Sequence, residues 1–155
     1  MRKSQKGFSL IELLIVVAII LILAAIAVPN LLSAKASANE SSAVGSLRSL
    51  NLACVTYSNA YDIGFPAALS NLGPAATPSA AAADLIDSQL VTGTKSGYSF
   101  VYAPGAVDAS GNIPTFTINA NPMSSQSGTR YFFIDESGEI TFALGTPAGS
   151  SDTPI

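Results

Sequence analysis

The sequence predicts an α+β protein in which one long N-terminal helix packs on an antiparallel sheet of three or four strands. An apolar run near the start, an apolar stripe with helical spacing after it, and four strand candidates beyond residue 97, two of them with alternating polarity, carry this prediction. An amphipathic helix needs a partner and a sheet needs one covered face. We therefore expect the helix to cover the sheet.

The apolar run is long enough to cross a membrane. All sixteen residues from Leu13 to Val28 are apolar, and the stretch 8–28 spans about 31 Å as a helix at ~1.5 Å per residue. A hydrocarbon core is roughly 30 Å thick. Three basic residues precede the run, which favours a cytoplasmic N-terminus and an outward-facing remainder.

One carboxylate interrupts this apolar segment. Glu12 lies near its start, and a carboxylate at the centre of a membrane helix costs roughly 2.5–3.5 kcal/mol. It is either an acid at the membrane interface or a charge that awaits a cationic partner. The residues by themselves show a carboxylate in an unfavourable place.

The segment Lys6–Glu12, KGFSLIE, resembles the processing motif of type IV prepilins and type II secretion pseudopilins. The resemblance is strong across residues 6–32. It implies a leader, residues 1–7, that a membrane peptidase removes after Gly7 before methylating the new amino terminus at Phe8. It also implies a pilin fold and a role for Glu12 in assembly.

The same resemblance implies the partners. They are other copies of the chain in a helical filament, the prepilin peptidase and methyltransferase, and an inner-membrane assembly platform with its ATPase. The subunit would lie in the inner membrane before assembly and in an extracellular pilus afterwards. A type II secretion pseudopilin is the alternative, and a monomeric membrane-anchored binding module is a third interpretation. No cofactor is implied.

Pro29 follows the apolar run, and we expect it to kink the helix, since a helical pattern resumes at once. Within 31–61, six residues recur at spacings of four and three and predict one buried stripe: Ala43, Leu47, Leu50, Cys54, Tyr57 and Tyr61. The stripe places Cys54 in the core as a structural thiol.

The remainder is predicted to be a loop followed by strands. Residues 62–97 contain prolines and glycines, with one or two helical turns possible over 81–91. Strands are predicted at 98–103, 115–120, 130–135 and 139–144, the last two joined as a hairpin. The domain plan is thus residues 8–29 as membrane or filament-core helix, 30–61 as amphipathic helix and 62–155 as loop and sheet, with 30–155 forming one globular domain.

Composition excludes several function classes. The 155 residues include no histidine and a single cysteine, which removes His-based catalysis, an intramolecular disulfide and Cys-rich metal sites. Four basic residues are dispersed after Lys6, so a nucleic-acid surface is not expected. We expect no enzyme.

The acidic residues Asp135, Glu136 and Glu139 form the densest acidic cluster and are weak candidates for a calcium site. Calcium takes six to eight oxygen ligands, and a hairpin with three carboxylates supplies some of them. A solvated turn is the favoured interpretation.

Overall fold

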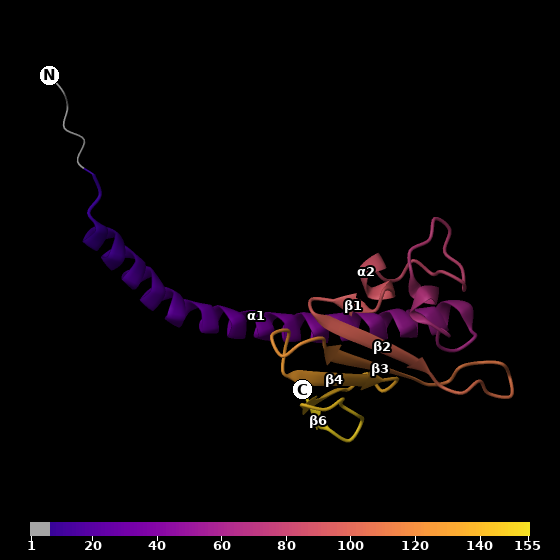
Figure 1. Cartoon of the computed structure of the whole chain (residues 1–155). Helices are drawn as coiled ribbons and strands as arrows, with labels where there is room; N and C mark the ends of the chain where they lie inside the picture. Colours follow the sequence, from indigo (N-terminus) through magenta and orange to yellow (C-terminus); the bar gives the residue numbers. More distant parts are fainter. Residues whose placement is uncertain (1–6) are drawn as a thin grey trace. The chain divides into compact units, whose positions relative to one another are not determined.

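The computed structural model describes residues 7–155. It forms two compact units, one ending at Ala34 and the other running Lys35–Ile155. The leader residues 1–6 lie outside the described part of the chain, so the predictions that concern them remain predictions. Helix α1, Leu10–Tyr61, runs through both units, and the second unit, called the head below, contains all strands (Figure 1).

The predicted stripe is confirmed. In the head, α1 buries Ala43, Leu47, Leu50, Cys54 and Tyr57, while Tyr61 is half-buried. Ser46 and Ala53 are buried beside them. The opposite side of this helical segment is exposed, so burial follows the period of the sequence.

The sheet has six strands in chain order, every neighbouring pair antiparallel. Its strands are β1 (Thr94–Lys95), β2 (Tyr98–Pro104), β3 (Phe116–Pro122), β4 (Arg130–Asp135), β5 (Ile140–Leu144) and β6 (Thr153–Pro154). The four predicted strands are confirmed to within two residues at either end. The expected three or four strands become six because β1 and β6, with two residues each, are too short to show alternation.

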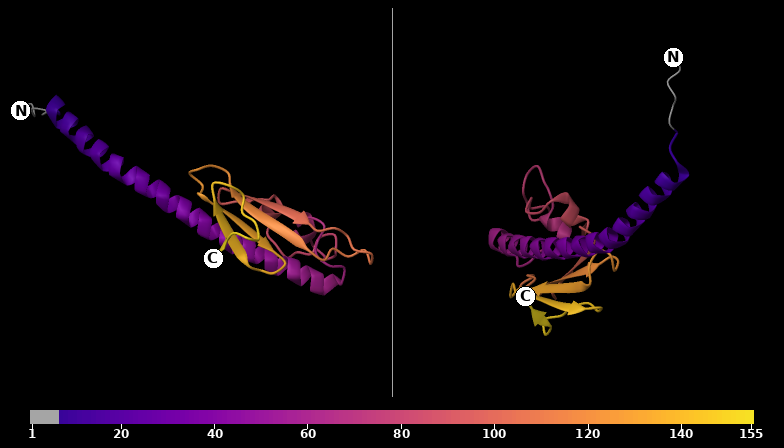
Figure 2. Two further views of the ribbon diagram at one scale, coloured as in Figure 1. Left: turned by 90° about the horizontal axis from the view of Figure 1, so that it is seen from below. Right: turned by 90° about the vertical axis from the view of Figure 1, so that its left-hand side faces the viewer.

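One face of the sheet packs on α1, as Figure 2 shows for the head. Alternate residues of β3, namely Phe116, Ile118 and Ala120, are buried in the same cluster as the helical stripe. Cross-strand partners extend that face, with Ala120 opposite Phe132 and Ile118 opposite Ile134. The core is therefore a single layer between helix and sheet.

The C-terminal segment covers the other face. The Asn119 side chain donates to the carbonyl of Ala148 at 2.8 Å, and the Thr141 hydroxyl donates to the carbonyl of Gly149 at 2.7 Å. Strand β6 then pairs with β5. Because of this cover, Phe133 is buried although it points away from the helix-facing layer.

The connection from α1 to β1 contains two short helices, η1 (Leu69–Leu72) and α2 (Ser88–Val91). The Asp87 carboxylate caps α2 by accepting the Leu90 amide at 2.8 Å and pairs with Lys95 at 2.9 Å. The backbone N–H of Leu90 is the main cause that lowers the pKa of Asp87, with Lys95 adding to it. Asp87 is therefore the N-cap of α2.

Candidate functional site

The N-terminal end of α1 places Glu12 in the first turn of the helix. The Ser9 amide donates to Glu12 Oε2 at 2.8 Å, and the Leu13 amide donates to the Ser9 carbonyl at 3.2 Å. Ser9 thus stands where a helix cap belongs, with Glu12 three residues later. The motif Ser-x-x-Glu could have predicted this cap from the sequence.

The apolar part of α1 is exposed among the described residues 7–155. Every residue from Gly7 to Ala34 is exposed, including the large side chains Leu10, Ile20 and Leu23. In the described residues, α1 is the one helix that is long and apolar enough to cross a membrane. A surface this apolar requires lipid or other protein around it.

Pro29 lies inside α1, which continues without a break to Tyr61. The proline therefore does not end the helix. It removes one backbone donor from the helical ladder, which is why a kink at this position remains our prediction.

In the head, Glu40 of α1 links the helix to the start of β4. Its Oε1 accepts the Thr129 amide at 2.8 Å, the Thr129 hydroxyl at 3.2 Å and the Arg130 amide at 3.3 Å. Its Oε2 lies 3.2 Å from Arg130 Nε, and the Glu40 side chain is 12% exposed. The Arg130 guanidinium also lies over the Phe142 ring, 5.4 Å from its centroid.

This link could not be predicted from spacing, since Glu40 stands on the polar face of the helix and its partners follow 89 and 90 residues later. Gly128 makes the close approach possible. A Cβ at Gly128 would lie 2.1 Å from the Tyr98 hydroxyl oxygen and 3.1 Å from Glu40 Cγ. The Tyr98 hydroxyl in turn donates to the Arg130 carbonyl at 2.8 Å.

The calcium candidates lie in the β4–β5 turn. Asp135 is engaged within the turn, because its Oδ1 accepts the Ser137 amide at 3.0 Å and the Ser137 hydroxyl at 2.6 Å. Glu136 and Glu139 are exposed. Across residues 7–155, no three acidic or cysteine side chains are grouped closely enough to hold a metal ion.

The buried thiol and phenol groups of the head have a structural role. Burial raises the pKa of the Cys54 thiol to about 12, and burial also raises the pKa values of Tyr98 and Tyr102. A thiol held protonated at neutral pH is a poor nucleophile. The Tyr102 hydroxyl donates to the Pro66 carbonyl, which fixes the loop after α1.

Comparison with known proteins addresses the N-terminal segment. Residues 2–28 match the model of the prokaryotic N-terminal methylation motif. The chain therefore carries a prokaryotic N-terminal methylation motif. A relative from Thermus thermophilus, the type IV wide pilus major component PilA4, is 63% identical over 38 residues. No solved structure matches the chain.

The similarity to PilA4 covers only a short segment of each chain. It covers 24% of this chain and 29% of the relative. The helix and sheet of the described residues nevertheless have a pilin-like layout, which agrees with the fold that the sequence predicts.

Proposed function

We propose that this chain is a structural subunit of a type IV pilus-like filament that polymerises through the apolar half of α1. The observation that carries the proposal is the conjunction of the methylation motif with an apolar helix that is exposed among residues 7–155. A membrane anchor would explain the apolar helix. It would not explain Gly7, Phe8 and Glu12 at their spacing.

Processing gives the spacing its purpose. Cleavage after Gly7 frees the Phe8 nitrogen as an ammonium group, which a separate methyl transfer then methylates. Glu12 lies four residues on, about one helical turn. In a staggered bundle, Glu12 of one subunit meets the Phe8 ammonium of a neighbour. Two such charges ~4 Å apart at an effective dielectric constant near 20 attract by about 4 kcal/mol before desolvation.

A bundle out of register would leave Glu12 unpaired among apolar helices, and an unpaired buried charge is strongly penalised. In the uncut chain the Ser9 amide satisfies one oxygen of that carboxylate. Glu12 therefore has a partner within its own helix while it waits for the ammonium group. The pair would select the register, and the apolar surfaces would fill the core.

The partners follow from this role. The basic leader keeps the N-terminus cytoplasmic. A prepilin peptidase and methyltransferase acts there on the inner-membrane precursor, and an assembly platform with its ATPase extracts the subunit into a surface filament. The second candidate is a pseudopilin of a type II secretion system, because the N-terminal motif resembles that of both classes.

Intact mass tests the proposal. Sheared surface filaments should contain a species that begins at Phe8 and carries one added methyl group. The same species confined to membranes would support a pseudopilin. An uncut chain in cells with an active peptidase would refute both and leave a membrane-anchored module.

A variant series tests the role of Glu12. Glu12→Ala should abolish filaments while cleavage after Gly7 continues. Arg48→Ala, a matched removal of one exposed charge in the head, should leave filament yield unchanged. Filaments of Glu12→Ala at the wild-type level would show that register does not depend on this carboxylate.

A further inference from the structure

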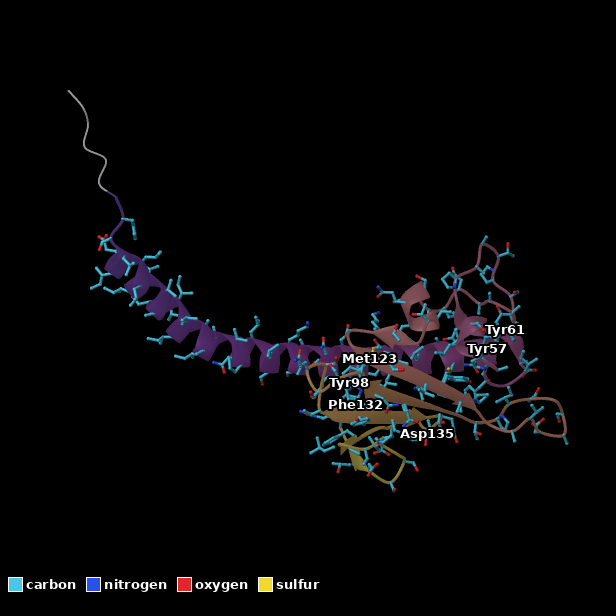
Figure 3. The ribbon with its side chains drawn as sticks, in the orientation of Figure 1. Tyr57, Tyr61, Tyr98, Met123, Phe132 and Asp135 are labelled. Carbon is cyan, nitrogen blue, oxygen red and sulfur yellow. The ribbon has the colours of Figure 1, made fainter. Side chains whose placement is uncertain are left out.

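The two ends of the sheet differ in chemistry. Strand β4 begins at Arg130, opposite Leu144, and ends beside the β4–β5 turn. The five steps from Arg130 to Asp135 place these ends about 17 Å apart at ~3.3 Å per residue. Figure 3 shows Met123 towards one end of the sheet and Asp135 towards the other.

The Met123 end carries a polar pocket of about 290 Å³ beside α1. Lys35 and Asn39 of α1 line it, together with Ser96 before β2 and with Gln126 and Ser127 of the β3–β4 loop. Short backbone bonds hold these loops, since the Met123 amide donates to the Gly97 carbonyl at 2.9 Å and the Ser127 amide donates to the Ser124 carbonyl at 2.9 Å.

The basic residues at this end differ in whether they form an ion pair. Lys95 pairs with Asp87 and Arg130 pairs with Glu40. Lys35 is exposed and has no carboxylate within 4.0 Å among residues 7–155. The pocket therefore offers a free ammonium group with amide and hydroxyl groups around it, which is a donor set for a carboxylate.

The opposite end presents exposed carboxylates at the β4–β5 turn. Glu136 and Glu139 flank the β4–β5 turn, and their side chains make no hydrogen bond or ion pair among the described residues. Asp135 and Ser137 brace the turn from within. Asn51 of α1, which lies beside Gly138, marks this end on the helix.

The two ends of the sheet lie beside different positions along α1. Lys35 and Asn51 are sixteen residues apart on α1, or about 24 Å at ~1.5 Å per residue. A second copy displaced along the helix direction would therefore bring its acidic turn towards the Lys35 pocket of the first. The two contacting surfaces are different, and such a heterologous contact repeats from copy to copy and builds an open polymer.

We propose that the Lys35 pocket of one head binds the β4–β5 turn of another copy through Glu136 and Glu139. This contact rests on the proposed filament function and adds a head-to-head interface to the apolar core. The contact makes assembly sensitive to salt, because dissolved ions screen the attraction between exposed charges.

A charge-swap series on the full-length chain tests the contact. Lys35→Glu should lower the yield of sheared filaments roughly tenfold, because the attraction of an exposed pair becomes repulsion. Glu136→Lys with Glu139→Lys should do the same. The three substitutions together should restore the yield, and Arg48→Glu, an equal charge change at another exposed position of α1, should leave it unchanged.

Intact mass of the membrane fraction separates this proposal from the proposed function. In every variant the subunit should begin at Phe8, which shows that processing continues and that assembly is what fails. Loss of filaments in Lys35→Glu but not in the turn variant would overturn the second copy as the occupant and indicate another anion, such as a lipid headgroup. Failure of the triple variant to recover filaments, or a Lys35→Glu yield equal to that of Arg48→Glu, would also overturn it.

Discussion

Replacing Glu40 by alanine should loosen the attachment of the sheet to α1. The substitution removes the acceptor of three hydrogen bonds from Thr129 and Arg130 and the ion-pair partner of Arg130. The Glu40 carboxylate is largely buried, whereas Thr129 and Arg130 are exposed. Removal of the carboxylate therefore leaves hydrogen-bond donors that water can reach.

The expected magnitude follows from that difference. A hydrogen bond to a charged group contributes about 1.5–3 kcal/mol. The 2.8 Å bond from the Thr129 amide falls in that class, whereas the longer bonds and the Arg130 pair, at 46% exposure of the arginine side chain, add little. Water reaches the freed donors, so we expect Glu40→Ala to lower the free energy of unfolding by about 2 kcal/mol.

Tyrosine fluorescence during urea unfolding in detergent micelles measures this change in the head, because all five tyrosines lie between residues 57 and 131. The melting temperature should fall by about 8 °C, at ~4 °C per kcal/mol for a domain of this size. Glu136→Ala should stay within about 0.5 kcal/mol of wild type as the exposed control. A Glu40→Ala loss below about 0.5 kcal/mol would refute the link.

Three further outcomes are expected. Gly128→Ala should cost about 1–3 kcal/mol in the same unfolding assay, because a Cβ there meets the Tyr98 ring, whereas Gly149→Ala, with open space around it, should cost less than half as much. Equal losses would contradict the packing account. Stability should fall as pH rises from about 9 to 12, because unfolded chains release the Cys54 proton that the folded head retains. Cys54→Ala should flatten the first part of that decline, and an unchanged slope would rule out the thiol as its source. The melting temperature should agree within about 1 °C in calcium and in chelator, and a rise of several degrees with calcium would restore a metal site at the β4–β5 turn.

Periodicity carried most of the fold. The buried stripe from Ala43 to Tyr57 follows helical spacing, and the alternate residues Phe116 and Ile118 of β3 are buried as the strand pattern predicts. Each of these elements buries one face, and one-sided burial requires apolar residues at the spacing of the helix or strand. Edge strands bury little, so β1 and β6 left no comparable pattern.

The polar contacts of the head lay beyond such reasoning. Glu40 finds its partners across 89 residues, and Asp87 caps a helix of four residues. One carboxylate on a polar helix face has the same appearance in sequence whether it is solvated or bonded. Ser9 and Glu12 are different, since a cap of three-residue spacing is local and its motif is visible.

The apolar helix and the polar contacts contribute differently to the free energy of assembly. Lipid is about as apolar as the side chains from Leu13 to Val28, so moving this helix from a bilayer into a bundle of like helices gains little from the hydrophobic effect. Packing and polar contacts must then decide whether a polymer forms. Conservative apolar exchanges such as Ile19→Leu should therefore change filament yield much less than Glu12→Ala or Lys35→Glu, although Ile19 lies within the proposed core.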